Sequence, residues 1–365
     1  MYHDIQPFKN NYADARAQFM TVLAKKNCEV TSFRHPQNGL SNEPLCLDVA
    51  WIGSREAKNV LVSSSGTHGV EGIMGSGIQI AALESGLYDQ LPKNSAVLLI
   101  HAINPWGFSW LRRANEDGVD LFRNFINFDH IPVHNPLYDK VLDTVLVPPR
   151  CNILTDIKAN ATLLKYAMQY GAQTVKQAIA EGQFKHAHGP FFGGFSPTWS
   201  NRQLTEIIKS YLTCAQHVVA IDYHSGLGRS GDGELIGFDK PDEASYRIAR
   251  QYWGENYVSS YSNKSVAYKI NGALPNIYKD LLPSSQLIFA AHEFGTCSQR
   301  RVLRALRADH WLYSHGDPNS REAEKIRKEV KTAFFRENHH WQQSVFKQAA
   351  AAERNVISAF AREVT

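Results

Sequence analysis

Short apolar runs alternate along the chain with longer segments in which apolar residues recur at helical spacing. The runs at 45–51, 60–62, 94–103, 217–221 and 286–291 predict buried strands. Helical spacing is found over 11–26, 73–83, 156–181, 202–213, 243–252, 301–312, 320–336 and 341–363. The helix at 73–83 lies between two of the strands, and this β-α-β order favours a parallel sheet. We therefore expect an α/β protein.

The loop that joins the strand at 60–62 to the following helix carries an H-x-x-E motif, formed by His68 and Glu71. Loops at the carboxyl ends of parallel strands line the ligand crevice of such sheets. Imidazole nitrogens and carboxylate oxygens are both ligands of Zn²⁺, and a catalytic zinc takes three protein ligands. The motif alone has a simpler interpretation, a surface histidine with a glutamate that favours the helix dipole.

Composition limits the functions to consider. The chain has 365 residues and a net charge of +4, with the basic residues dispersed, so we expect no nucleic-acid partner. The five cysteines include no C-x-x-C pair, which argues against a cysteine zinc cluster. We find no leader pattern at the start and no apolar run of the ~20 residues needed to span a bilayer. We therefore expect a cytoplasmic protein with free thiols and no membrane partner.

A polar loop follows the strand at 94–103 and contains Arg112, Arg113 and Arg123. The guanidinium group matches the two oxygens of a carboxylate, so these residues are candidates for substrate recognition or for polarising a carbonyl. The alternative is that they only form surface ion pairs with the acidic residues of the same loop.

Three motifs together resemble the zinc carboxypeptidase superfamily. They are H-G-x-E at 68–71, N-P-x-G at 104–107 and G-V-D-L-x-R-N-F at 118–125. That superfamily contains the carboxypeptidase A-like enzymes and, more distantly, the aspartoacylase and succinylglutamate desuccinylase deacylases. The chain is most similar to an uncharacterised bacterial branch of it. The resemblance implies a three-layer α/β/α zinc-exopeptidase fold with a mixed, mainly parallel sheet. We expect one catalytic domain over 1–365, with a helical extension from about 317.

The resemblance also assigns roles to residues. It implies one Zn²⁺ held by His68, Glu71 and a histidine after a later strand, His224. Independently of the resemblance, Asp222 is a candidate for orienting a ligand imidazole, and the alternative is that it only ends a strand. Glu293, which follows the strand at 286–291, matches the general base. Further implied roles are oxyanion stabilisation by Arg112 or Arg113, and substrate binding by Arg123 and Asn124.

One departure from the family pattern concerns specificity. Carboxypeptidases carry Asn-Arg where this chain has Phe122-Arg123, and that Asn helps to hold the terminal carboxylate. We therefore expect a metallocarboxypeptidase-type exopeptidase, with a deacylase of N-acyl amino acids as the alternative. A peptide or an N-acyl amino acid with a free carboxylate is the expected substrate. A third possibility is a zinc protein without activity that binds peptides. The helical tail has the length to pack on the core or on a second subunit.

Overall fold

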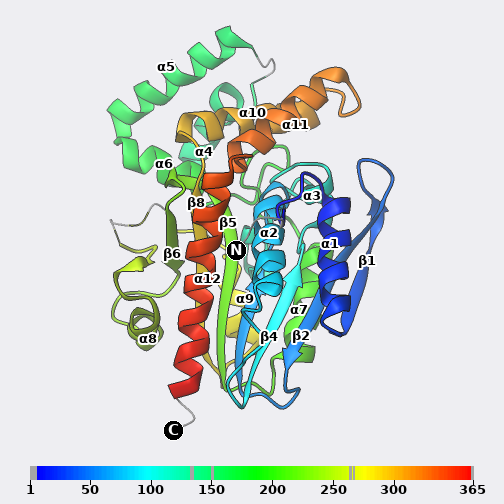
Figure 1. Cartoon of the computed structure of the whole chain (residues 1–365). Helices are drawn as coiled ribbons and strands as arrows, with labels where there is room; N and C mark the ends of the chain where they lie inside the picture. The colour runs from blue at the N-terminus through cyan, green and yellow to red at the C-terminus, as the bar shows by residue number, and fades with distance from the viewer. Residues whose placement is uncertain (1–5, 132–134, 149–151, 263–264, 266–267, 363–365) are drawn as a thin grey trace.

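The computed structural model describes residues 6–131, 135–148, 152–262, 265 and 268–362 (Figure 1). Within them, eight strands form one mixed sheet in the order β1-β2-β4-β3-β5-β8-β6-β7. Their bounds are β1 Val30–Asn38, β2 Pro44–Gly53, β3 Asn59–Ser64, β4 Ser95–His101, β5 His217–Ser230, β6 Gly233–Gly237, β7 Tyr257–Ser259 and β8 Gln286–Gly295. The central strands β4, β3, β5 and β8 are parallel, whereas β1–β2, β2–β4 and β6–β8 pair antiparallel. The predicted α/β class and mixed sheet are confirmed.

Helices cover both faces of the sheet. The described helices are α1 Tyr12–Lys25, α2 Gly72–Glu84, α3 Pro105–Ser109, α4 Pro136–Val141, α5 Ile153–Tyr170, α6 Ala172–Ala180, α7 Trp199–Tyr211, α8 Ala244–Trp253, α9 Pro275–Leu281, α10 Gln299–His315, α11 Arg321–Phe334 and α12 His339–Arg362. Side chains alternate along each strand, so Leu61 belongs to the core that contains residues of α1, α2, α8 and α12, whereas Val60 and Val62 belong to the core with residues of α7 and α9. The result is three layers. No described helix has both the length and the apolar character needed to cross a membrane.

The C-terminal helix α12 belongs to the main core. Its apolar face, which includes Trp341, Val345 and Val356, is buried against the sheet together with α2 and α8. Glu353 on the same helix is fully buried and accepts hydrogen bonds from Tyr88 and Tyr223, at 2.5 and 2.7 Å. The apolar face of α12 is thus buried against other parts of the same chain. Its predicted role in pairing two subunits stays a prediction.

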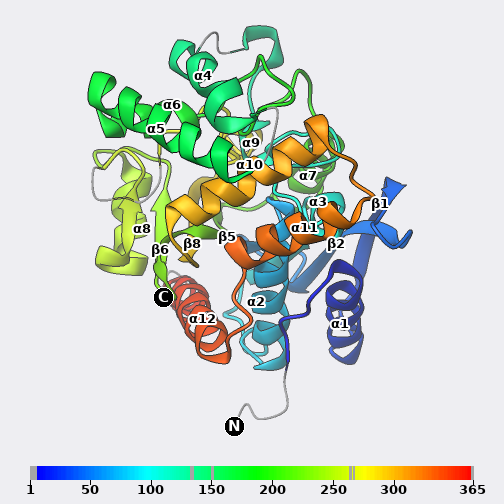
Figure 2. The same ribbon diagram turned by 90° about the horizontal axis from the view of Figure 1, so that it is seen from above.

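Three predicted elements, one helix and two strands, differ in extent from the observed ones. The helical pattern at 156–181 is interrupted at Gly171, whose φ of +88° favours glycine, and the segment forms α5 and α6. The strands predicted at 217–221 and 286–291 both continue, because β5 and β8 stay paired up to Ser225 and Phe294. His224 and Glu293 therefore lie within strands rather than in the loops that follow them. Helices α4, α5, α6, α10 and α11 gather at one end of the sheet (Figure 2).

Candidate metal centre and active site

The H-x-x-E motif occupies a tight junction between β3 and α2. A short 3₁₀ turn at Gly69–Glu71 follows His68, and α2 begins at Gly72. A Cβ atom at Gly69 would lie 2.0 Å from the backbone of Gly107, so only glycine allows the two loops to approach this closely. The side chains of His68 and Glu71 are buried by this packing.

His224 reaches the same place from β5, which runs parallel to β3. Its Nδ1 atom lies 3.1 Å from Nδ1 of His68 and 3.1 Å from a carboxylate oxygen of Glu71. Nδ1 of His68 lies 3.1 Å from the other Glu71 oxygen. The structure therefore brings together the three residues that the sequence predicted as metal ligands.

Each imidazole is held from behind by a carboxylate. Nε2 of His68 lies 3.0 Å from Asp120, and Nε2 of His224 lies 2.6 Å from Asp222. Asp222 also accepts hydrogen bonds from the hydroxyls of Ser64 and Thr67. A carboxylate can only accept, so each Nε2 donates a hydrogen bond to its aspartate. Each Nδ1, which faces Glu71, is then the atom that would bind a cation. This arrangement orients ligand imidazoles in metal sites.

The three residues fit a divalent cation. One donor atom from each of His68, Glu71 and His224 lies within 4.8 Å of the others. A metal ion binds neutral imidazole, and with each Nε2 hydrogen-bonded to an aspartate the two Nδ1 atoms, 3.1 Å apart beside buried Glu71, would supply the lone pairs. Two histidines and one glutamate are a known donor set of catalytic zinc sites.

Glu293 lies on β8, next to His224 on β5, and lines the same pocket. It accepts a hydrogen bond of 2.9 Å from the backbone N–H of Leu227. Burial and the nearby charge of Glu71 raise the pKa of Glu293 to about 8, and they outweigh the opposing effects of His224 and Leu227. Its neighbour His292 points to the opposite face and packs against Phe294, as strand alternation predicts.

The two adjacent arginines have different environments. Arg113 lines the pocket and makes ion pairs with Glu71 and Asp120, at 2.9 and 3.2 Å. Arg112 points away, donates through Nε to both oxygens of Asp309 at 3.1 Å and stacks on the ring of Tyr313. Arg113 thus faces the cluster of His68, Glu71 and His224, whereas the side chain of Arg112 is directed away from it and engaged with Asp309.

The two residues predicted to bind substrate, Arg123 and Asn124, also lie in different environments. Arg123 lines the pocket, but its Nη atoms already donate to Asp120 at 2.6 Å and to the carbonyl of Ala180 at 2.5 Å. Asn124 is fully buried outside the pocket lining, and its amide bonds the backbone of Gly193, Ser196 and Thr198. We therefore give Asn124 a role in supporting the loop at 193–198 instead of substrate contact.

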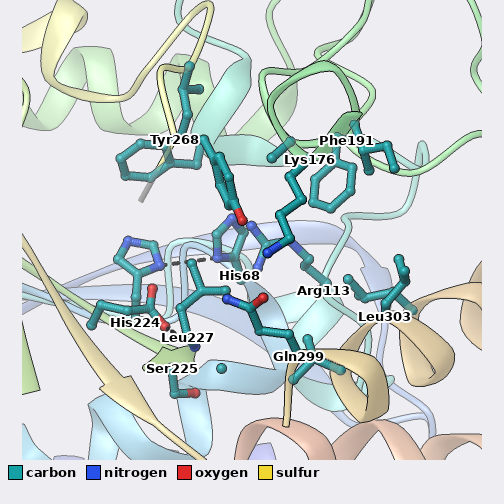
Figure 3. Close-up of a pocket in the computed structure, with 18 of the residues that line it drawn as sticks. His68, Arg113, Lys176, Phe191, His224, Ser225, Leu227, Tyr268, Gln299 and Leu303 are labelled. Carbon is teal, nitrogen blue, oxygen red and sulfur yellow. Dashed lines mark hydrogen bonds between the residues drawn. The ribbon is translucent and has the colours of Figure 1, made fainter. Parts of the chain in front are cut away.

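The cluster opens into a pocket of about 340 Å³, which falls within the ordinary size range of ligand sites. Figure 3 shows side chains entering this pocket from several elements, with Tyr268 and Lys176 above His68 and with Gln299 and Leu303 from α10. One side of the pocket comes from α5, α6 and α10, which lie far from the H-x-x-E motif in the sequence.

The comparisons place the chain in a family. The family model described as "Protein of unknown function (DUF2817)" matches residues 8–348. The chain belongs to the DUF2817 family. A comparison with curated proteins found no match.

Solved structures share the fold of this DUF2817 protein. Bovine thrombin-activatable fibrinolysis inhibitor, solved with tick carboxypeptidase inhibitor, aligns at a TM-score of 0.51 with 12% identity, over 98% of this chain and 99% of that chain. Carboxypeptidase A from Helicoverpa armigera aligns at 0.47 with 12% identity, over 90% and 75%. An aspartoacylase family protein from Mesorhizobium loti aligns at 0.38 with 13% identity, over 79% and 67%. The alignment with the fibrinolysis inhibitor and the mixed eight-stranded sheet show the fold that the resemblance to the zinc carboxypeptidase superfamily predicted.

Sequence reasoning missed several residues of the site in this DUF2817 chain. Asp120, which anchors His68 and pairs with two arginines, was interpreted only as an acidic neighbour of the arginine-rich loop. Its position in the G-V-D-L-x-R-N-F motif was a usable signal. Lys176 and Leu303 gave no signal, because a residue on an amphipathic helix does not reveal which cavity the helix will line.

Proposed function

We propose that this protein is a zinc-dependent hydrolase that cleaves an amide bond in substrates with a free carboxylate. The observation that carries the proposal is the convergence of His68, Glu71 and His224 beside Glu293 at the floor of one pocket. Two oriented imidazoles, a buried carboxylate and a separate carboxylate with a raised pKa form a set that suits metal-assisted hydrolysis.

The residues of the chain take distinct roles in this reaction. When bound, zinc supplies Lewis acidity, which polarises a carbonyl and acidifies water. Glu293 accepts a proton from the attacking water and delivers a proton to the leaving nitrogen. Arg113, which lines the pocket beside Glu71, stabilises the negative charge that develops on the carbonyl oxygen. The C–N bond breaks, a C–O bond forms, and the products are a carboxylate and an amine.

The role of Glu293 is tested by the substitution Glu293→Gln, which keeps the size and removes the base. We expect hydrolysis to fall roughly 100- to 10,000-fold, with unchanged zinc content and thermal stability. Glu56→Gln changes an exposed glutamate of the β2–β3 loop and serves as the matched control. If the Glu293→Gln protein hydrolyses every responsive substrate at the wild-type rate, the assignment of the base is wrong.

Both reactions anticipated from the sequence use this chemistry. Carboxypeptidase-type cleavage releases the C-terminal residue of a peptide, and deacylation releases the amino acid of an N-acyl amino acid. In either reaction the substrate carboxylate would need a partner other than Arg123, because the Nη atoms of Arg123 are already engaged and Phe122 packs its ring 5.1 Å from that of His224. Release of C-terminal residues from short peptides, compared with hydrolysis of N-acetyl and N-succinyl amino acids, separates the two.

A further inference from the structure

One wall of the pocket is made of aliphatic side chains from three helices. They are Leu163 and Ala167 of α5, Ala172, Val175 and Ile179 of α6, and Val302, Leu303 and Leu306 of α10. None of these side chains has a hydrogen-bond donor or acceptor. The N–H and C=O groups of a bound peptide would lose their hydrogen bonds to water along this wall and find no new partners there. Burying them in this way is unfavourable. An alkyl chain gives up no hydrogen bonds to water when it binds here, and its transfer out of water is favourable.

The charged residues of the pocket lining are mainly cationic. Among the described lining residues, Arg113, Arg123, Lys176 and Arg300 face one carboxylate that is not a predicted metal ligand, Glu293. The guanidinium groups of Arg113 and Arg123 are already paired with Asp120, so neither has a complete pair of donors left for a two-oxygen contact with a substrate carboxylate.

Lys176 differs from the two engaged arginines. It projects from α6 between the aliphatic residues Val175 and Ile179, and Figure 3 shows it extending into the pocket toward His68. The described residues provide it with no ion pair. An ammonium group in this position suits a substrate carboxylate as a point charge.

From the aliphatic wall and the position of Lys176 we propose that the substrate is an N-acyl amino acid with a long alkyl chain. The chain lies along the aliphatic wall, and the carboxylate of the amino acid contacts Lys176. This inference rests on the proposed hydrolase and names its substrate class. Water adds to the acyl carbon as the amide C–N bond breaks. Its oxygen enters the fatty carboxylate, and its two hydrogens end on the amino group, which leaves as an ammonium.

The first test varies chain length at a constant amino acid. We expect kcat/KM to rise roughly three- to four-fold per methylene from N-acetyl to N-dodecanoyl substrates, below their micelle concentrations. Leu303→Gln should reduce this increment. Leu154→Gln is the matched control, because Leu154 lies on α5 outside the pocket with 76% of its surface exposed. Equal kcat/KM values along the series in an active enzyme would overturn the inference and leave the proposed hydrolase standing.

The second test addresses the carboxylate contact. Lys176→Met should raise KM for N-dodecanoyl amino acids about ten-fold, while KM for the corresponding methyl esters stays constant. Lys165→Met on α5, an exposed lysine outside the pocket, should change neither. An equal effect on acids and esters would overturn the role of Lys176 as the carboxylate partner.

A binding measurement separates the inference from the proposed catalysis. Titration calorimetry with N-dodecanoyl and N-acetyl amino acids on the Glu293→Gln protein needs no turnover. Tighter binding of the dodecanoyl compound with a negative heat-capacity change supports the apolar wall as its site, even if no substrate is hydrolysed and the hydrolase proposal fails. Equal binding of the two compounds overturns the inference.

Discussion

The Nδ1 atoms of His68 and His224 lie 3.1 Å apart, although 156 positions separate the two residues in the chain. The sheet brings them together because β3 and β5 are adjacent and parallel, so their carboxyl ends lie at the same edge. The two opposite Nε2 atoms are hydrogen-bonded to Asp120 and Asp222, and this turns both Nδ1 atoms toward Glu71. The metal-site hypothesis rests on this geometry.

The first prediction concerns metal content. Protein purified and loaded with zinc should hold one ion per chain, and His68→Ala or His224→Ala should lower this to a small fraction, because three protein ligands are needed. Elemental analysis measures the ratio. His186→Ala removes a histidine that pairs with Asp139 outside the cluster and should leave the content unchanged. Full zinc content in both alanine variants of the cluster would contradict the site.

The second prediction concerns the carboxylate behind His224. Asp222→Asn removes the charge that orients the imidazole and should weaken zinc binding roughly 10- to 100-fold. Competition with a chelator of known affinity measures the change. Asp139→Asn is the control, because Asp139 lies 2.6 Å from His186, away from the cluster. Equal zinc affinity in the two variants would show that Asp222 does not tune the site.

The third prediction concerns Arg112 and stability. Arg112→Met leaves Asp309 buried without its ion-pair partner, and losing one member of a buried pair costs about 3–5 kcal/mol. Burial already raises the pKa of Asp309, so the unpaired carboxylate is unfavourable. Urea unfolding measures the loss. The double substitution Arg112→Met with Asp309→Leu should recover much of it, and a double variant as unstable as the single one would contradict the pairing argument.

The fourth prediction concerns Arg113. Arg113→Met should lower kcat roughly 100- to 1,000-fold, the usual effect of removing one oxyanion donor. The reduction should appear equally in kcat and kcat/KM, because the interaction forms mainly in the transition state. A rise in KM with constant kcat would instead assign Arg113 to substrate binding.

The fifth prediction concerns acid stability. Burial lowers the pKa of His292 from 6.5 to about 3, so the folded protein keeps it neutral. Between those values the unfolded chain binds a proton that the folded chain does not, and stability falls as pH falls. His292→Phe should reduce the slope of the unfolding free energy by up to ~1.4 kcal/mol per pH unit in this window.

Urea unfolding of the metal-free protein at several pH values from 7.5 to 4.5 measures that slope. A residual slope is expected in the variant, because burial also lowers the pKa of His101 and His310, to about 4 and 3. Identical slopes for wild type and His292→Phe would show that His292 does not contribute.

The sequence was sufficient to predict those properties that depend on a few neighbouring residues. The buried runs located the central strands, and the H-x-x-E motif identified His68 and Glu71, because both signals are contained within short segments. The break at Gly171 is also local, but a helical pattern on both sides concealed it.

The tertiary structure decided which partners the polar side chains meet. Arg112 and Arg113 are identical in type and adjacent, yet one pairs with Asp309 of α10 and the other with Glu71. The length of β5 and β8 depended on their pairing with each other, and the apolar wall depended on packing between α5, α6 and α10. These contacts join segments distant in the chain, whose positions are set by burial of the whole core. Residue type and spacing therefore determined the fold class and the candidate ligands, whereas the direction of each arginine and the character of the pocket followed from long-range packing.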